Sequence, residues 1–460
     1  MNTRPKIPAN ARNLNACVIG SSGSGKTRFW LTPQLLQAHS SYVVVDPKGG
    51  TLSQCGYFLQ KKKGYKVKVF NSIDFSKSMH YNPMAYIKTE SDVLKFVNAL
   101  IANTKGDGKE GDEFWTKAET LLYCALVAYI VFEGPEEERN MNTLVEMINS
   151  MEVREDDESF KNAVDYMFDG LAKRSPQHFA VRQYAKYKLA SGKTAKSILV
   201  SAAVRLAPFN LPQIKAVTDH DDMDLYTLGE RKCALYAVIP DNDTTFTFLV
   251  SLLYSQIFQT LYYCADQIHH GALPCHVHFI LDEAPSVNLP GLPRELATMR
   301  SRNISCSTII QNMAQIKELY KDSWETIPGN SDTLLYLGGN EASTHKYISE
   351  ALGKSTIGTK THGQTKGRSG SYSTNFQMSG RELLTPDEVR MLDNRYCILF
   401  IRGTQPVMDE KYELMEHPAI RYTMDGGGPP YIHHGTAEPP IPGKPLFQTD
   451  FDNEKENAAA

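Results

Sequence analysis

The most informative stretch of this 460-residue chain is Gly20-Ser21-Ser22-Gly23-Ser24-Gly25-Lys26-Thr27. It matches in full the pattern G-x-x-x-x-G-K-[ST], in which glycines let the backbone approach phosphate groups. An apolar run over 16–19 precedes it and a helical pattern over 28–38 follows it. This is the strand–loop–helix order that such a loop requires. The stretch therefore predicts a phosphate-binding loop rather than a chance glycine-rich turn.

Lys26 and Thr27 are the two side chains of this loop that we expect to act on a bound nucleotide. Lys26 should reach the β- and γ-phosphates, and Thr27 should bind Mg²⁺. We therefore expect a nucleoside triphosphate and Mg²⁺ as ligands. The phosphates should also be held by the backbone N–H groups of the remaining positions, which are Gly20, Ser21, Ser22, Gly23, Ser24 and Gly25.

A second motif, HVHFILDE over 276–283, supplies the acids that a phosphate loop needs. Its apolar strand ends in Asp282 and Glu283, so both carboxylates should lie at the carboxyl edge of the sheet, near the loop. Asp282 should hold Mg²⁺ through water, and Glu283 should orient or deprotonate the attacking water. A metal site built on the two histidines of this strand and Cys275 is an alternative use of the segment. Their spacing matches no zinc pattern and favours packed or solvated histidines.

Three polar side chains flank the predicted strand 305–310. Gln311 ends the strand, where an amide senses the γ-phosphate or positions water, or else caps the strand end. Arg300 and Arg302 precede the strand. In ring ATPases an arginine from one subunit completes the site of its neighbour. A contact with a phosphate backbone or a surface ion pair is the alternative role for either arginine.

The segment VVVDPKGG over 43–50 closes the second predicted strand, whose carboxyl end should also face the nucleotide. Asp46 is a candidate for contacting the direct ligands of Mg²⁺ rather than the ion itself. Lys48 is a candidate for contact with phosphate or with a neighbouring subunit. The alternative is an ordinary Pro-Gly turn.

Eight apolar, β-branched runs bounded by turn residues predict strands. Several are continuous rather than alternating, which fits a parallel sheet buried on both faces. Helical patterns lie between many of them, so the expected fold class is α/β with a mostly parallel sheet. The runs are 16–19, 42–45, 66–70, 233–239, 276–281, 305–310, 333–337 and 396–401.

Residues 91–230 interrupt this alternation, because they contain little β-rich sequence. Apolar residues recur at helical spacing from Val93 to Ile101, and further helical patterns follow. We therefore expect an all-α domain, inserted into a nucleotide-binding domain that consists of 1–90 and 231–425.

Two other segments are expected to lack regular structure. Residues 354–381 carry five basic and no acidic side chains among many Ser, Thr and Gly residues. This composition predicts a basic, flexible loop that contacts nucleic-acid phosphates, with subunit contacts or plain disorder as the alternatives. Gly and Pro fill 11 of the 20 positions of 426–445, so 426–460 should form a flexible tail.

Composition limits the class of protein. Hydrophobic residues make up 41% and charged residues 22% of the chain, as in globular proteins. The net charge of -3 excludes a binder held to nucleic acid by bulk positive charge, but not a locally basic channel. The longest apolar run, 121–132, has 12 residues, against about 20 for a membrane span, so we expect no such span. Eight scattered cysteines without a CxxC pair predict reduced thiols in a cytosolic protein.

The ordered set of motifs resembles the cytosolic part of the type IV coupling proteins of the TraG/TraD type. The resemblance covers about residues 15–415 and rests on the whole set, because the phosphate loop alone would fit many families. The set consists of GSSGSGKTRFW (20–30), VVVDPKGG (43–50), YNPM (81–84), GDEFWTKAE (111–119), FILDEAPSV (279–287), MRSRNISCSTIIQ (299–311) and LLTPDEVRML (383–392).

This resemblance implies a RecA-like P-loop ATPase domain, with the inserted all-α domain selecting substrates. It implies a homo-hexameric ring around single-stranded DNA that uses ATP and Mg²⁺ to export DNA, and sometimes protein, through a type IV secretion channel during conjugation. The family's roles carry over to Lys26 and Thr27 for the nucleotide, Asp282 and Glu283 for Mg²⁺ and water, Gln311 for the third motif, and Arg300, with Arg302 competing, for the trans-acting arginine.

The partners implied are single-stranded DNA with its relaxase complex, and components of the channel. Such proteins normally begin with membrane-spanning helices, which this sequence lacks. We expect a soluble, cytoplasmic piece of a protein from the cytoplasmic face of the inner membrane, or a membrane-free member, and a monomer in isolation. Two alternative functions stay open: a substrate-recruiting receptor with nucleotide as a switch, and another DNA translocase of the FtsK/HerA type.

Overall fold

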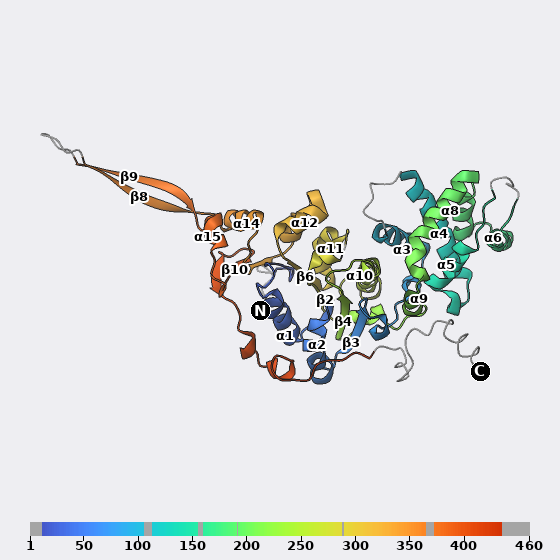
Figure 1. Cartoon of the computed structure of the whole chain (residues 1–460), viewed down its shortest axis with the longest axis horizontal. Helices are drawn as coiled ribbons and strands as arrows, with labels where there is room; N and C mark the ends of the chain where they lie inside the picture. The colour runs from blue at the N-terminus through green and yellow to red at the C-terminus, as the bar shows by residue number, and fades with distance from the viewer. Residues whose placement is uncertain are drawn as a thin grey trace, which may run out of the picture.

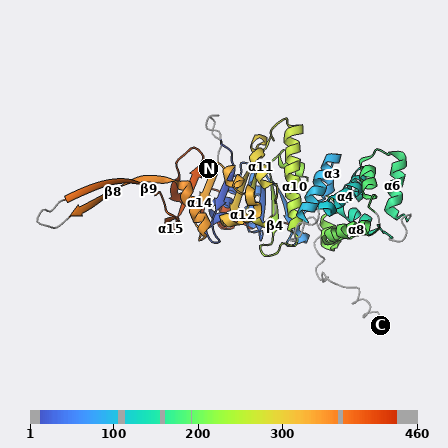
Figure 2. The ribbon, with the colours of Figure 1, turned by 90° about the horizontal axis from the view of Figure 1, so that it is seen from above.

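The computed structural model describes residues 12–104, 113–154, 160–190, 192–287, 289–364 and 372–434. Three parts follow one another along the long axis of the molecule (Figure 1). A sheet with its covering helices lies in the middle, a group of helices lies at one end, and a long β-hairpin projects from the other. The view from above shows the same order (Figure 2).

A nine-stranded sheet, in the order β11-β10-β7-β1-β6-β5-β2-β4-β3, forms the middle part. The strands from β7 to β3 pair in parallel, and β10 and β11 join one edge antiparallel. The predicted α/β class is confirmed, and all eight predicted strands are present. The strands are β1 (Ala16–Ile19), β2 (Ser41–Pro47), β3 (Lys66–Asn71), β4 (Cys233–Ile239), β5 (Val277–Leu281), β6 (Ile304–Ile310), β7 (Thr333–Tyr336), β10 (Tyr396–Ile401) and β11 (Val407–Glu410).

Both faces of the sheet are buried, because successive strand residues point to opposite sides. In β2, Val43 and Val45 belong to one apolar core, whereas Tyr42 and Val44 belong to the other. The second core packs under α1 and α2, and the first packs under the remaining helices around the sheet. These helices are α1 (Thr32–Gln37), α2 (Gly50–Tyr57), α10 (Thr247–Tyr263), α11 (Leu292–Thr298), α12 (Met313–Tyr320), α13 (Thr326–Gly329), α14 (Ala342–Leu352) and α15 (Pro386–Arg390).

The chain between β3 and β4 forms helices joined by loops, with no strand among the residues that the structure describes there. Helix α4 packs against α3, α5, α7 and α8, and α3 also packs against α10 beside the sheet. One apolar core therefore continues from the sheet face into this helical part. Its helices are α3 (Glu90–Asn103), α4 (Glu113–Glu133), α5 (Met141–Asn149), α6 (Ala163–Arg174), α7 (Phe179–Tyr187), α8 (Gly192–Leu206) and α9 (Pro212–Val217).

Helix α4 is long and apolar enough, by length and composition alone, to cross a membrane over Phe114–Glu133. The unbroken-run criterion applied to the sequence did not predict this, because Thr116, Lys117, Glu119 and Thr120 separate the apolar run 121–132 from Phe114 and Trp115. The helix is 56% buried over its apolar window, and 122–128 at its centre are buried. A helix that is apolar on all sides is what the centre of a helical bundle requires.

The predicted flexible loop over 354–381 is wrong. The structure has a two-stranded antiparallel hairpin there, with β8 (Lys354–Gln364) paired to β9 (Tyr372–Glu382) from Lys354–Glu382 to Gln364–Tyr372. Its Thr, Tyr, Phe and Ile residues favour strands, although the many Ser and Gly residues look like a loop. The hairpin stands away from the sheet (Figures 1 and 2). Lys366 and Arg368 lie outside the described residues.

The predicted flexible tail is wrong for its first residues. Residues 426–434 follow the surface of the sheet part, and the Tyr431 N–H donates to the Ser53 carbonyl at 3.0 Å. The Tyr431 ring lies so close to Gly56 that a Cβ there would approach it to 2.5 Å, so glycine makes room for the ring. The rest of the predicted tail, 435–460, lies outside the described residues.

All eight cysteines are unpaired, and seven of them are buried. Burial raises the pKa of Cys17, Cys124 and Cys306 to about 12, so these thiols stay protonated at neutral pH. This agrees with the predicted free thiols and with their place in the apolar cores.

Candidate nucleotide-binding site

The phosphate loop lies where the carboxyl ends of β1, β6, β5 and β2 meet, at one edge of the sheet. The Gly20 N–H donates to the Ile310 carbonyl at 3.1 Å, which ties the start of the loop to the end of β6. Gly23 and Gly25 adopt φ angles of +79° and +86°. Residues with a side chain rarely adopt this conformation, so the motif glycines are needed for the shape of the loop.

The loop itself holds the Lys26 ammonium. Lys26 Nζ donates to the carbonyls of Gly20 at 2.8 Å and Ser21 at 3.1 Å. Burial lowers the pKa of Lys26, and the charges of Asp282 and Glu283 oppose that shift. The ammonium is therefore placed over the loop, within the field of both acids.

Thr27 and Asp282 form an oxygen pair beside the loop. The Thr27 hydroxyl donates to Asp282 Oδ2 at 3.2 Å. Burial raises the pKa of Asp282, against the hydrogen bond from Thr27 and the charge of Lys26. A hydroxyl and a buried carboxylate are oxygen donors of the kind that Mg²⁺ prefers, so these residues fit the predicted ion.

Glu283 and Gln311 meet at the ends of β5 and β6. Gln311 Nε2 donates to Glu283 Oε1 at 3.2 Å. Glu283 has a φ of +52°, and the Ser286 N–H closes the following turn on its carbonyl at 2.7 Å. The Gln311 side chain thus contacts the carboxylate of Glu283, which is predicted to act on the attacking water, at the edge where both strands end.

Asp46 anchors a helix, and it also lines a cavity that begins at the phosphate loop. Its carboxylate accepts the N–H groups of Thr51 at 3.1 Å and Leu52 at 2.6 Å, in the first turn of α2. Burial raises its pKa to about 6, with these two N–H groups acting against the shift. Lys48 pairs with Asp241 at 2.5 Å.

A cavity of about 670 Å³ extends from the phosphate loop, past Asp282 and Glu283, to a segment near the end of the described chain. This segment, residues 411–434, is called the strap; the sequence did not single out 411–425, and 426–434 belong to the predicted tail. Three strap residues line the cavity: Leu414, Met424 and Asp425.

Polar contacts hold the strap to the loop and to the helix that follows it. Lys411 Nζ donates to the Ser24 carbonyl at 3.1 Å, within the phosphate loop. Glu413 pairs with Arg28 at 3.1 Å, across 385 positions of sequence. No local motif signals such a long-range contact, and for this reason the sequence did not reveal it.

Further along, Gln54 Nε2 of α2 donates to Asp425 Oδ1 at 2.7 Å. Leu414 is buried at 1% exposure against the second sheet core. The strap therefore forms a fixed wall of the cavity that begins at the phosphate loop.

Arg300 and Arg302 lie at the opposite edge of the sheet, before β6 begins. Arg302 binds Asp266 through two N–H groups at 2.8 and 2.7 Å, and its guanidinium covers the Tyr262 ring at 4.4 Å. The Arg300 side chain is exposed and makes no hydrogen bond or ion pair with any residue that the structure describes. Neither arginine is brought to the phosphate loop of its own chain.

The histidines of the β5 segment are packed, not arranged around a metal. His278 bonds with the hydroxyls of Ser305 at 2.5 Å and Ser307 at 3.0 Å. His276 bonds with Ser40 at 2.6 Å and again with Ser305 at 3.0 Å. Both ring nitrogens of each histidine are thus engaged, which agrees with the packed alternative.

Comparison with known proteins identifies the family. A family model for the type IV secretory system, conjugative DNA transfer, matches residues 9–421. The chain belongs to this family. The resemblance to type IV coupling proteins is thereby confirmed.

Curated relatives of this family member are longer than the chain. It is 25% identical over 457 residues to protein VirD4 of Rhizobium radiobacter, covering 97% of this chain and 62% of that protein. It is 26% identical over 389 residues to the conjugal transfer protein TraG of Escherichia coli, covering 79% of this chain and 59% of that protein. The chain thus spans about 60% of the length of the curated relatives that it matches.

Solved structures share the fold. The unbound form of the bacterial conjugative coupling protein TrwBdeltaN70 matches with a TM-score of 0.63 at 17% identity, covering 88% of this chain and 87% of that one. The plasmid coupling protein TrwB in complex with ADP and Mg²⁺ matches with a TM-score of 0.62 at 16% identity, covering 86% and 84%. At this identity the match shows the fold alone.

Proposed function

We propose that this chain is the ATP-hydrolysing motor part of a conjugative coupling protein, which moves single-stranded DNA toward a type IV secretion channel. The observation that carries the proposal is the meeting of Thr27, Asp282, Glu283 and Gln311 around the phosphate loop. Family membership supports the setting, and so does the similar fold of TrwB, which has been solved in complex with ADP and Mg²⁺.

The nucleotide tail would be held by the loop N–H groups and by Lys26, which exchanges its two loop carbonyls for phosphate oxygens. Thr27 and Asp282 would hold Mg²⁺, which neutralises charge on the phosphates when bound. We expect the wall formed by the strap to face the nucleoside, because it lines the same cavity as the phosphate loop and is held to α2.

Glu283 would act as the general base. Its carboxylate accepts a proton from water while the water oxygen bonds to the γ-phosphorus and the bond to the β–γ bridging oxygen breaks. Gln311 holds one oxygen of Glu283 and so positions the other. Cleavage therefore depends on the placement of one side chain at the end of β5.

We further propose that residues 91–230 act as an inserted domain that selects substrates, and that six copies assemble into a ring when active. The helical structure of this part supports the first point. The exposed Arg300 supports the second, because it lies far from its own loop but is free to enter the site of a neighbouring copy. Relaxase-bound DNA and channel components are the proposed partners.

Turnover of ATP by the full chain, without DNA and with single-stranded or double-stranded DNA, tests the motor. We expect stimulation by single strands and a loss of turnover of about 10²–10⁴-fold in Glu283→Gln, with ATP binding retained. Lys26→Ala should instead weaken ATP binding by about 10–100-fold, since charge-assisted hydrogen bonds contribute about 1.5–3 kcal/mol. Glu318→Gln, an exposed glutamate on α12, is the matched control and should behave as wild type.

Two outcomes would contradict the proposal. Stimulation by duplex DNA alone would indicate another kind of DNA translocase. Equal inertness of the wild type and Glu283→Gln, in the presence of nucleotide and single-stranded DNA, would leave a receptor in which nucleotide binding is only a switch.

A further inference from the structure

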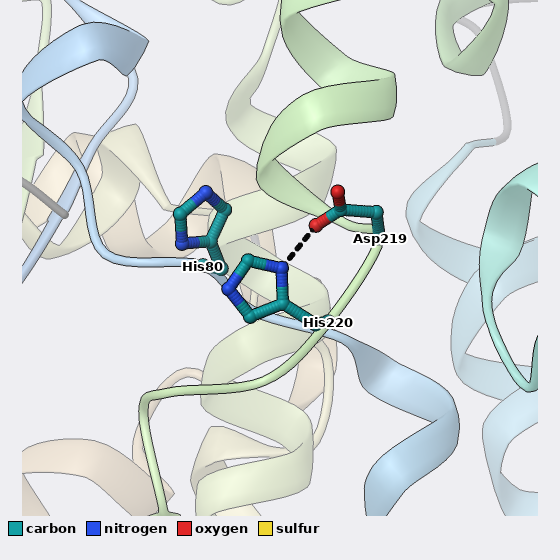
Figure 3. A group of neighbouring side chains, drawn as sticks. All are labelled: His80, Asp219 and His220. Carbon is teal, nitrogen blue, oxygen red and sulfur yellow. Dashed lines mark hydrogen bonds and ion pairs between the residues drawn. The ribbon is translucent and has the colours of Figure 1, made fainter. Parts of the chain in front are cut away.

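A cluster of two histidines and an aspartate lies far from the phosphate loop in the chain, at the base of the helical part. His80 stands on the segment that leaves β3, and Asp219 and His220 stand on the segment that returns from α9 (Figure 3). One ligand atom of each side chain lies within 4.8 Å of the others. The centroids of the two histidine rings lie 3.9 Å apart, with the ring planes tilted by 32°.

We propose that His80, Asp219 and His220 bind one Zn²⁺ ion, which clamps the outgoing and returning segments of the helical part together. Neither the nucleotide chemistry nor the family match depends on this site. Its failure would leave the proposed motor function untouched.

The backbone already holds the two segments side by side. The Asp222 N–H donates to the His80 carbonyl at 3.2 Å, and the Tyr81 N–H donates to the Val217 carbonyl at 2.8 Å. Asp221, which lies between His220 and Asp222 in the sequence, accepts a hydrogen bond from the hydroxyl of Tyr86 on the outgoing segment at 2.6 Å. The site would therefore form on a prearranged crossing, with little cost in chain entropy.

His80 also has the partner that a metal ligand needs. Its Nδ1 lies 3.2 Å from Asp222 Oδ2. Metal-bound histidines commonly donate their other ring N–H to a carboxylate, which fixes the ring and raises its basicity. Asp222 is thus a positioning residue for the His80 ring.

Two buried polar atoms near the cluster make no hydrogen bond to any described residue. They are Asp222 Oδ1 and Nε2 of His433, a strap residue whose pKa is lowered by burial against the charge of Asp222. Buried polar atoms are rarely left unsatisfied. The crossing therefore has buried hydrogen-bonding atoms that its contacts with the described residues leave unused.

The chemistry of the donors selects the ion. Two imidazoles and one carboxylate suit Zn²⁺ and similar borderline ions, rather than Mg²⁺ or Ca²⁺. Three protein ligands leave a fourth position for water. Asp219 and His220 are 47% and 58% exposed, which gives an ion a path to the site.

Binding requires a small adjustment. Zn–N and Zn–O bonds of about 2.0–2.2 Å place tetrahedral ligand atoms about 3.4 Å apart, closer than the separations of up to 4.8 Å within the cluster. The exposed side chains of Asp219 and His220 have room to rotate by this amount. In the structure they bond to each other, His220 Nδ1 to Asp219 Oδ1 at 2.5 Å, and the ion must replace this contact.

Titration of the tag-free, reduced full chain with Zn²⁺ alone, by calorimetry and with the thermal midpoint as a second readout, tests the proposal. We expect one ion per chain, with binding weakened by roughly tenfold or more in His220→Ala and a rise in the thermal midpoint in wild type only. Asp222→Asn should weaken binding by about 10–100-fold without changing the midpoint of the metal-free protein. Co²⁺ in place of Zn²⁺ should give the visible absorption of a low-coordinate site.

Two matched controls separate this site from other donors. His270→Ala removes an exposed histidine elsewhere, and Cys275→Ser removes the only cysteine that is not fully buried; both should bind as wild type. The proposal is overturned if the wild type takes up no stoichiometric Zn²⁺, if His220→Ala binds equally well, or if Cys275→Ser abolishes binding.

Discussion

Glu283 has an unfavourable backbone conformation, and a hydrogen bond from Gln311 fixes the orientation of its side chain. A φ of +52° in a non-glycine residue costs free energy, of order 1–3 kcal/mol, and persists only where the surroundings enforce it. Here the turn to Ser286 enforces the backbone, and Gln311 holds the carboxylate. Such strain is common where a side chain must be presented to a ligand. This is the position at which the chain must turn an acid from the end of β5 toward the phosphate loop.

Asp46 should give the protein a measurable pH dependence. Its pKa is about 6 in the folded protein, against 3.8 ordinarily, because the carboxyl is buried. The folded state therefore keeps a proton that the unfolded state has already lost. The contribution of Asp46 to the free energy of unfolding is complete below about pH 4 and is lost as the pH rises through 6, by at most about 3 kcal/mol.

Urea unfolding of wild type and Asp46→Asn between pH 4.5 and 7.5 measures this contribution. The free energy of unfolding of wild type, relative to that of the variant, should fall as the pH rises, because the asparagine does not titrate. Asp243→Asn is the control, since Asp243 is exposed and its pKa is lowered by a hydrogen bond from Thr245. A difference that is flat or rises over this range would show that Asp46 is not held protonated.

Among the elements of the fold, the strap links nucleotide binding to the far end of the described chain. Tyr431 seats it, since its N–H bonds to Ser53 and its ring fills the space over Gly56. We expect Tyr431→Ala to weaken ATP binding by about tenfold, equivalent to about 1.4 kcal/mol. Binding of tripolyphosphate should be unchanged, because the phosphate loop keeps its own contacts.

Calorimetry with the two ligands makes the comparison. Ile432→Ala is the matched control, because its side chain is 63% exposed. Equal losses for ATP and tripolyphosphate would mean that the strap supports the loop rather than the nucleoside.

The hairpin of β8 and β9 carries several basic side chains, and the acids near them lie at its base, where Glu382 is opposite Lys354 and Glu388 pairs with Arg381. Lys354 and Lys360 are exposed on it, and Lys360 Nζ lies 4.8 Å from the centre of the Phe376 ring. Cations and aromatic rings together are the means by which proteins hold single strands. We expect Lys354→Gln with Lys360→Gln to reduce the salt dependence of single-stranded DNA binding, by about 0.7 in the log–log slope for each phosphate that is no longer neutralised.

The salt series should be run beside a matched pair, Lys61→Gln with Lys63→Gln, which removes two exposed lysines near the end of α2. That pair should leave the slope unchanged. An unchanged slope in the hairpin variant would reassign the hairpin to contacts between proteins, for which its exposed Phe376 and Met378 are suited.

Sequence reasoning predicted those elements whose signal is local. The continuous apolar runs of β1 and β4 were predicted to the residue, because a strand buried on both faces can be composed of little else. The hairpin was not, since its Ser and Gly residues give the same composition as a loop. The strap and the crossing at His80 were not, because each depends on residues far apart in the chain.

Across the whole molecule, the position of Arg300 bears on the proposed ring of copies. The seven residues of β6 separate it from Gln311 at the nucleotide edge, a span of about 20 Å at roughly 3.3 Å per residue. An arginine side chain cannot cover that distance within its own chain. If Arg300 takes part in hydrolysis, it must do so in the site of a neighbouring copy.

Mixing two inactive variants decides this. Glu283→Gln lacks the base but offers Arg300, whereas Arg300→Ala keeps the base but lacks the arginine. In rings assembled at random from equal amounts, roughly a quarter of the interfaces pair an intact base with an intact arginine, and a similar share of wild-type turnover should return. Arg302→Ala is the control. It keeps both Glu283 and Arg300, and Arg302 is held by Asp266, so this variant should turn over ATP without a partner variant. Wild-type turnover by Arg300→Ala alone would place Arg300 outside the reaction, and full loss of turnover in every mixture, from rings that still bind ATP, would exclude its action in a neighbouring copy.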